Sequence, residues 1–114
     1  MGEFFFYLAP SKIDGVGVFA ARNIKSGQTV KLFWETSVPR KRIPKLFQKF
    51  IVDTEIGCWA PRCFGRMSVG WYLNHSKNSN LDYDTHSDSF TTTRDIKKGE
   101  EVTVDYIKAG FGKP

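Results

Sequence analysis

WYLNHSKNSN, residues 71–80, changes character halfway along its length. Its first residues are apolar and suit a buried turn or a short strand. Its second half consists of short polar side chains, which hydrogen bond to nearby backbone and favour turns. Such a segment can hold side chains rigidly at the edge of a pocket. Asn74 offers both donor and acceptor groups there, and His75 offers a ring nitrogen of each kind.

Two further segments bear on how residues 71–80 are interpreted. Residues 15–20 read GVGVFA, and residues 98–106 read KGEEVTVDY, a charged turn followed by a strand-like run. Taken alone, the tripeptide at 74–76 is often only a loop with a satisfied histidine. The glycine turn is likewise often only a hairpin. Glycine also lets another group approach the backbone closely, so the same turn suits a ligand edge.

Length, charge and apolar runs limit the class of protein. The 114 residues are enough for one domain with a modest core. The formal net charge of +5 permits an anionic partner but does not require one. No apolar run approaches the roughly 20 residues that a membrane-spanning helix needs. The aromatic run at 4–8 is too short for a signal segment and lacks a basic flank. We therefore expect an intracellular domain, cytoplasmic or nuclear, that is neither secreted nor membrane-bound.

The sequence has few candidate metal ligands. Cys58 and Cys63 are its only cysteines, and His75 and His86 are its only histidines. These residues could in principle bind zinc, but no Cys-x-x-Cys spacing is present. Nothing points to an oxidising compartment, where a disulfide would form. We expect free buried thiols and no metal site.

Most of the chain reads as short strands. They are expected over 4–9, 16–20, 29–35, 81–84, 87–93 and 101–106, which are separated by glycine, proline and polar turns. Pro10 is expected to end the first of them. Residues 22–27 and 94–99, RNIKSG and RDIKKG, predict two similar turn-to-strand corners.

Residues 40–52 have a different pattern. Apolar residues recur on one helical face, at Ile43, Leu46, Phe47, Phe50 and Ile51. Pro44 is tolerated in a first helical turn. The basic residues between them most simply form a solvated face, with nucleic-acid or membrane binding as the lesser alternative. This pattern predicts one helix.

The glycine turn, the Asn-His-Ser tripeptide and the segment GEEVTVDY, in this order, resemble the SET-domain lysine methyltransferases. The resemblance covers roughly Phe5 to Tyr106. It implies a mainly β, β-clip fold of small sheets in one domain, residues 1–114, with a short helix inserted at about 40–52 and a short tail at 107–114. In this fold the segment after Asn-His-Ser and the C-terminal strand form a pseudoknot, which would bring Asn74, His75 and Tyr106 together.

The resemblance also implies a reaction, methyl transfer from S-adenosylmethionine to a lysine ε-amine of a protein. The amine must be neutral to attack, although a free lysine has a pKa near 10.4. A narrow apolar channel and the positive sulfonium both disfavour the ammonium form. In-line positioning then supplies much of the acceleration. The substrate would be a lysine-containing protein or peptide, with a histone tail as one candidate. Residues 82–105 carry seven acids against three bases, which suits a basic peptide.

The resemblance assigns roles to individual residues. Tyr106 matches the catalytic tyrosine. The cofactor-binding residues implied are Gly15, Gly17, Val18, Asn74 and His75, with Phe111 as a cover for the adenine or the channel. The substrate channel implied is formed by Trp34, Tyr83, Val104 and Tyr106. Tyr83 stands where some members that add one methyl group place a tyrosine, so mainly mono- or dimethylation is expected.

The resemblance is incomplete at the C-terminus. Many members have a cysteine-rich zinc segment after the catalytic tyrosine, whereas residues 107–114 contain no cysteine. A partner subunit could close the site instead, which is compatible with a homodimer. Two alternatives stay open: a SET-like module that binds a peptide without catalysis, and a small basic β domain that binds nucleic acid. We expect no direct nucleic-acid contact, because the basic residues cluster on the predicted helix rather than among aromatics on a sheet.

Overall fold

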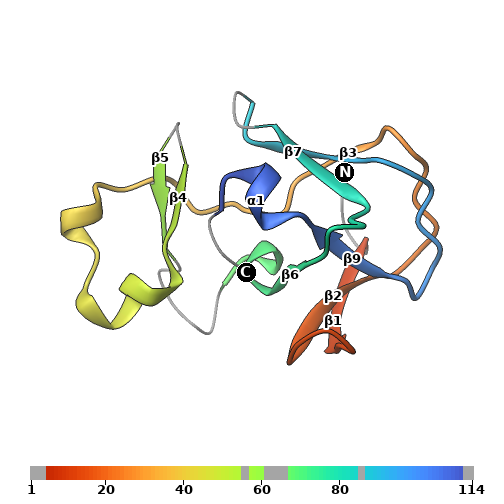
Figure 1. Ribbon diagram of the computed structural model, residues 1–114, viewed down its shortest axis with the longest axis horizontal. Coiled ribbons are helices and arrows are strands. Elements are labelled where there is room, and N and C mark those ends of the chain that lie inside the picture. Colours follow the sequence, from red (N-terminus) through yellow and green to blue (C-terminus); the bar gives the residue numbers. More distant parts are fainter. Residues whose placement is uncertain (1–4, 55–56, 61–66, 85–86, 112–114) are drawn as a thin grey trace.

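A computed structural model describes residues 5–54, 57–60, 67–84 and 87–111, and Figure 1 shows a body of short strands with the β4–β5 segment extending to one side. The strands are β1 (Phe6–Pro10), β2 (Val16–Ala20), β3 (Thr29–Val30), β4 (Val52–Thr54), β5 (Gly57–Trp59), β6 (Asn74–His75), β7 (Leu81–Asp84), β8 (Ser89–Thr92) and β9 (Glu101–Val104). Seven of them form a sheet in the order β1-β2-β9-β7-β8-β3, with β6 paired to β9 outside this path. The predicted mainly β fold of small sheets is confirmed.

Strand β9 is the centre of the sheet. It pairs antiparallel with β2, where Val18 faces Val102. It pairs parallel with β6, where Asn74 faces Thr103, and with β7, where Leu81 faces Val104. These pairings place the Asn-His pair beside the end of β9. They therefore bring His75 and Tyr106, which are 31 positions apart in the sequence, into contact.

Asn80 joins the polar segment to β9. It is 1% exposed, and its side chain donates to the carbonyl of Glu101 and accepts from the N–H of Thr103, both at 2.9 Å. The Asn80 side chain thus supplies hydrogen-bond partners to the backbone groups of β9 that a neighbouring strand would otherwise supply. The run of Asn and Ser is thus a structural bridge as well as a turn.

The core is formed by buried residues of this sheet, of the two similar corners and of the segments next to them. Its buried apolar residues are Val18, Ala20, Ile24, Val30, Leu32, Leu73, Leu81, Phe90, Ile96, Val102, Val104 and Ala109. Ile24 and Ile96, the isoleucines of the RNIKSG and RDIKKG corners, form an antiparallel bridge with two 2.8 Å backbone hydrogen bonds. The similar corners therefore pair with each other.

The predicted helix over 40–52 is wrong in its type and its extent. The segment forms two 3₁₀ helices, η1 (Arg40–Arg42) and η2 (Lys45–Phe50), and Pro44 lies between them. Ile43 is extended, with φ −85° and ψ 122°, because a residue before proline is pushed out of the helical region. Ile43 is buried with Cys58 and Ala60, but Leu46 is 67% exposed, so the expected apolar face is only partly used.

The C-terminal segment contains a short α-helix where the sequence predicted the end of a strand at Tyr106 and a tail over 107–114. Helix α1 (Tyr106–Ala109) follows β9 directly. The Asp105 side chain caps it by accepting from the N–H groups of Ile107 and Lys108, and Gly110 ends it at φ 79°. Both are standard helix-end residues. The cap fixes Tyr106 at the first helical position.

Two smaller expectations can also be compared with the structure. Pro10 does not end the first strand but is its last residue, which an edge strand allows because the missing N–H costs no ladder bond there. Cys58 is buried. Cys63 and His86 lie outside the described residues. Within the described ranges, no three potential metal ligands cluster, and no helix is both long and apolar enough to span a membrane.

Candidate functional site

Tyr106 is held by three contacts from the segment before and within β6. Its N–H donates to Nδ1 of His75 at 3.1 Å, and its ring lies 5.3 Å from the His75 ring. Its hydroxyl donates to the backbone carbonyl of Leu73. Because Nδ1 accepts, the proton of a neutral His75 ring is on Nε2. His75 and Leu73 therefore hold Tyr106 at its backbone, its ring and its hydroxyl.

The Tyr106 phenol is kept neutral by its surroundings. Burial raises its pKa, and the carboxylate of Asp14 raises the pKa further. Both effects disfavour the phenolate. The hydroxyl consequently has one proton, which it gives to the Leu73 carbonyl, and keeps its lone pairs for another donor.

A cavity of about 230 Å³ opens beside Tyr106. It is lined by Phe33, Phe50, Ile51, Val52, Met67, Gly70, Trp71, Leu73, Tyr106 and Phe111. Phe33 meets Trp71 edge to face with ring centroids 5.0 Å apart, and Phe111 lies 6.2 Å from Tyr106. The walls are thus mostly aromatic and aliphatic, and the Tyr106 hydroxyl and a carbonyl are polar groups beside them. Such a space suits an alkyl chain with a polar end.

Glu35 holds the Trp71 wall in place. Its carboxylate accepts from the Trp71 indole N–H at 2.9 Å, from the Ser68 N–H at 3.0 Å and from the Ser68 hydroxyl. Burial by itself raises the pKa of Glu35, but the accepted hydrogen bonds outweigh it, so the net shift is downward. The ionised Glu35 therefore anchors the segment that follows β3 to Ser68 and Trp71, at the start of and within the 3₁₀ helix η4 (Val69–Tyr72).

On the side of β6 that faces the glycine turn, Asn74 forms a polar cluster. Asn74 is 9% exposed, and its Nδ2 lies 3.0 Å from Ser11 Oγ, from the Asp14 carbonyl and from Glu101 Oε2. The Oδ1 atom accepts no hydrogen bond from any residue that the structure describes. Asn74 thus presents a free acceptor next to the glycine turn.

The three predicted edge residues of the glycine turn have different surroundings. Gly15 has φ +46°, and a Cβ added there would meet nothing within 4 Å, so it borders open space. A Cβ at Gly17 would lie 2.3 Å from Glu101 Oε2. Val18 is fully buried in the core. Of the three, Gly15 has room for a ligand to approach its backbone.

Tyr83 lines a smaller hollow next to the cavity. The hollow is lined by Phe33, Val52, Trp59, Tyr83, Asp88 and Phe111, three of which also line the cavity. The Tyr83 hydroxyl donates to Asp88 Oδ1 at 2.7 Å, and its ring lies 5.2 Å from Phe111. Burial, followed by this hydrogen bond, raises the Tyr83 pKa well above its usual 10.0. Its hydroxyl is therefore protonated and tied to Asp88.

Two of the other predicted channel residues, Trp34 and Val104, do not line the cavity. Trp34 is 58% exposed and does not line the cavity, whereas its neighbour Phe33 does. Val104 is 1% exposed and belongs to the core. Phe111, predicted as a cover, packs between Tyr83 and Tyr106 and lines the cavity and the hollow.

Several site residues were missed by sequence interpretation. They are Ser11, Phe33, Glu35, Trp71, Asn80 and Glu101. Glu101 belongs to the segment GEEVTVDY, where a charged residue gives no signal of burial. The register of β2 against β9 places the Glu101 side chain next to Gly17, and the residue type alone does not predict this.

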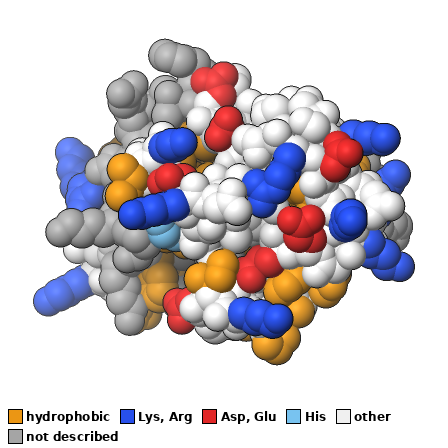
Figure 2. Space-filling view, turned by 45° about the vertical axis from the view of Figure 1, so that its right-hand side comes forward, with side chains coloured by type: hydrophobic (Ala, Val, Ile, Leu, Met, Phe, Trp, Pro, Cys, Tyr) orange, Lys and Arg blue, Asp and Glu red, His pale blue; other side chains and the backbone are white. Residues whose placement is uncertain are grey.

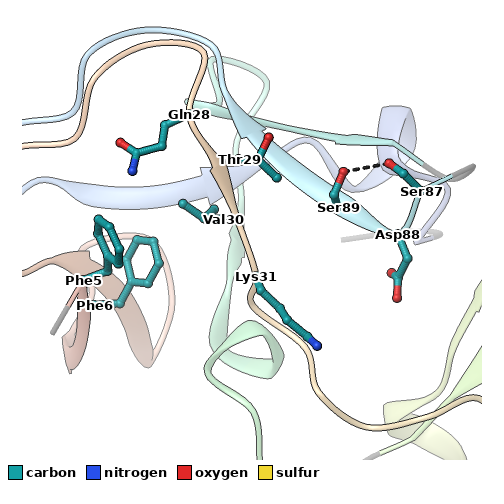
Figure 3. A pocket seen from close by; sticks show the side chains of 9 residues that line it. All are labelled: Phe5, Phe6, Gln28, Thr29, Val30, Lys31, Ser87, Asp88 and Ser89. Carbon is teal, nitrogen blue, oxygen red and sulfur yellow. Dashed lines mark hydrogen bonds between the residues drawn. The ribbon is translucent and has the colours of Figure 1, made fainter. Parts of the chain in front are cut away.

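A larger cavity, about 670 Å³, lies elsewhere, and of the site residues discussed above it shares Asp88. Figure 3 shows Phe5 and Phe6 at one end of it, Ser87, Asp88 and Ser89 at the other, and Lys31 between them. Its polar side chains are spread along the cavity, whereas three acceptors lie 3.0 Å from Nδ2 of Asn74. The site is therefore assigned to the Tyr106 region.

Comparison with known proteins identifies what the arrangement is similar to. The family model described as SET domain matches residues 15–107. No curated protein sequence matches the chain. Among solved structures, a candidate histone methyltransferase of Plasmodium falciparum has a TM-score of 0.65 at 18% identity, covering 92% of this chain and 95% of its own.

Two further solved structures show the same fold. The methyltransferase domain of human PR domain-containing protein 2 has a TM-score of 0.64 at 20% identity, over 90% of this chain and 77% of its own. Polycomb Repressive Complex 2 of Chaetomium thermophilum, in an autoinhibited conformation bound to S-adenosylmethionine, has a TM-score of 0.67 at 21% identity. That match covers 98% of this chain but only 16% of the matched chain.

Proposed function

The chain belongs to the SET-domain family, and on this premise we propose that it is a methyltransferase that moves a methyl group from S-adenosylmethionine to the ε-amine of a lysine in a protein. The observation that carries the proposal is the position of Tyr106. Its hydroxyl lies beside an apolar cavity of about 230 Å³, and its backbone N–H is bonded to His75, next to the polar cluster of Asn74. One tyrosine thus borders both a space for an alkyl amine and a place for a polar cofactor.

The residues around Asn74 fit S-adenosylmethionine. The acceptor Oδ1 of Asn74 suits its ammonium group, and the open space at Gly15 leaves room for backbone contact. Asp14, whose carboxylate acts on Tyr106, adds negative charge where a sulfonium would be favoured. When bound, the cofactor supplies an electrophilic methyl group. The chain's own part is to hold the cofactor's polar end.

The cavity beside Tyr106 fits the aliphatic part of a lysine. Phe33, Trp71 and Leu73 give it an apolar wall, which would lower the pKa of an entering ammonium and favour the neutral amine. The Tyr106 hydroxyl gives its proton to Leu73 and so turns its lone pairs toward such an amine. Tyr106 would thus orient the nitrogen, and positioning of this kind can supply a large part of the acceleration.

The substrate and the product are proposed from the surroundings of Tyr83. Asp82, Asp84 and Asp88 lie on and just after β7, which suits a basic peptide such as a histone tail. The Tyr83 hydroxyl, tied to Asp88, would restrain the amine, so mainly mono- or dimethylation is proposed. A homodimer that closes the site and an intracellular location, cytoplasmic or nuclear, belong to the same proposal.

The alternatives are supported less well. A peptide-binding module without catalysis would not need a cavity-lining Tyr106 that is bonded to His75, the residue next to Asn74. A nucleic-acid-binding domain would need a continuous basic surface. On the face shown in Figure 2, Lys and Arg side chains are spread among Asp and Glu.

The proposal is tested by incubating the protein with methyl-labelled S-adenosylmethionine and an array of lysine-containing peptides. A matched array with each lysine replaced by arginine is the control. We expect label on lysine peptides alone. A protein that binds the cofactor and a peptide but transfers no label would instead be a binding module.

A further inference from the structure

We propose that Glu101 is a positioning residue for the cofactor. Together with Ser11 it fixes the side-chain amide of Asn74, so that Oδ1 faces outward and can accept a hydrogen bond from the ammonium group of S-adenosylmethionine. This inference rests on the proposed function. It adds a residue whose carboxylate contacts Asn74 and would not contact the cofactor itself.

The hydroxyl of Ser11 is fully used within this cluster. It lies 2.8 Å from Glu101 Oε1 and 2.9 Å from Oε2, and it must donate its single proton to this carboxylate. Its oxygen accepts from the Ile13 N–H at 2.9 Å and from Asn74 Nδ2 at 3.0 Å. Ser11 therefore links Glu101 by hydrogen bonds to both the glycine turn and Asn74.

The neighbours of Asn74 determine which way its amide points. All three groups near Nδ2 are acceptors, because the Ser11 proton is given to Glu101 and the other two are a carboxylate and a backbone carbonyl. A flipped amide would place Oδ1 against the Asp14 carbonyl and Glu101 Oε2. Oxygen lone pairs would then face one another, and the two amide protons would lose their partners. The cluster thus leaves Oδ1 as the outward group.

Gly17 provides the space for the Glu101 carboxylate. A Cβ at this position would lie 2.3 Å from Glu101 Oε2 and 3.0 Å from Ser11 Cβ. Gly17 does not have a positive φ, in contrast to Gly15, so its backbone would accept alanine. Glycine is therefore needed at 17 for the carboxylate rather than for the turn.

The orientation matters because of the chemistry of the ligand. An ammonium group has donors and no acceptor, so it can be held by Oδ1 but not by an outward NH₂. A change that frees the Asn74 amide to rotate would reduce the population that can bind. It would weaken contact with the amino-acid end of the cofactor and leave contact with its adenosine end intact.

Two variants disturb Glu101 in different ways. Glu101→Gln keeps the shape, but its amide group must turn NH₂ toward Ser11 or Asn74, which are donors to this position. Gly17→Ala keeps the charge and displaces the carboxylate at the end of a flexible side chain. Glu100→Gln is the matched control, since it makes the same charge change next door, where the carboxylate accepts from the Lys97 N–H instead.

The test is calorimetric binding of two ligands, S-adenosylmethionine and 5′-methylthioadenosine, which lacks the amino-acid end. For Glu101→Gln and Gly17→Ala we expect about tenfold weaker binding of S-adenosylmethionine, the effect of losing one such hydrogen bond. Binding of 5′-methylthioadenosine should stay unchanged. Glu100→Gln should bind both ligands as the wild type does.

Other outcomes overturn the inference. Equal weakening of both ligands would mean that Glu101 only supports the fold, and unchanged binding of S-adenosylmethionine would mean that it does not act on Asn74. A wild-type protein that binds no S-adenosylmethionine would overturn the proposed function as well, so the two failures are distinguishable. NMR gives a readout without ligand: the Asn74 side-chain amide protons, assigned with Asn74→Asp, should exchange faster with water in Glu101→Gln, and equal exchange rates would contradict the inference.

Discussion

Replacing Tyr106 with phenylalanine removes one oxygen from the middle of the site. The ring, its contact with His75 at 5.3 Å and the backbone bond to Nδ1 are all retained. What is lost is the hydroxyl that donates to the Leu73 carbonyl. Because Leu73 is only 4% exposed, its carbonyl would be left without that partner in nearly dry surroundings.

The structure sets the size of the expected effects. An unsatisfied buried carbonyl costs about 1–2 kcal/mol of the free energy of unfolding. In a domain of this size that lowers the melting temperature by roughly 3–8 °C. Turnover should fall much more, by about 100-fold or more, because the amine loses the group that orients it. Cofactor affinity should be nearly unchanged, since the Asn74 cluster does not involve the phenol.

The assay combines three measurements on Tyr106→Phe: thermal unfolding, calorimetric binding of S-adenosylmethionine, and transfer of labelled methyl to a lysine peptide. Tyr72→Phe is a matched control, because Tyr72 does not line the cavity and its hydroxyl makes a weak contact with the Met67 sulfur, at 3.9 Å. The control should keep normal turnover. If folded Tyr106→Phe methylates at a near-normal rate, the catalytic assignment is wrong.

Three further predictions follow from the same contacts. Asn74→Ala should weaken S-adenosylmethionine binding about tenfold or more, and unchanged calorimetric affinity in the folded variant would refute the cofactor role. Tyr83→Phe removes the hydroxyl bound to Asp88 and should shift the products toward higher methylation in mass spectrometry; an unchanged distribution would mean that Tyr83 is only a packed strand residue. Both Tyr83 and Tyr106 have raised pKa values, so the folded state holds these protons more strongly than the unfolded chain. The free energy of unfolding should therefore be retained below about pH 10 and fall above it, and urea titrations should show a smaller alkaline loss for Tyr83→Phe.

The part of the site that could be predicted from sequence is the part set by short motifs. Asn74, His75 and Tyr106 were predicted to lie together, and the parallel pairing of β6 with β9 brings His75, the neighbour of Asn74, into contact with Tyr106. Each motif fixes its own local geometry, and their order along the chain identified the fold. The residues between the motifs carried no comparable signal.

The residues that line the cavity could not be predicted, because the sequence does not show which of two neighbouring side chains faces it. Phe33 and Trp34 are adjacent aromatics, and the sequence interpretation placed Trp34 in the channel. The structure turns Phe33 toward the cavity and leaves Trp34 58% exposed. The strand expected over 29–35 ends at Val30, so its alternation could not be extended to these positions. A shift of one residue reverses the facing of such a pair.

The helices were mispredicted for a similar reason. The apolar spacing over 40–52 fitted an α-helix, but Pro44 divides the segment, and the packing of Ile43 with Cys58 and Ala60 decides which apolar residues are buried. Conversely, α1 is only four residues long, too short for any periodicity to appear. Its cap Asp105 and its terminal Gly110 are residue types that suit helix ends, but they could be assigned to a helix only once the end of β9 at Val104 was known.

The central claim is that a lysine and S-adenosylmethionine reach Tyr106 from different sides. A crystal structure of the wild-type protein with S-adenosylhomocysteine and a lysine peptide tests this most directly. We expect the lysine side chain in the cavity between Phe33, Trp71 and Tyr106, and the amino group of S-adenosylhomocysteine bonded to Asn74 Oδ1. A lysine bound elsewhere, or both ligands in the one cavity, would contradict it.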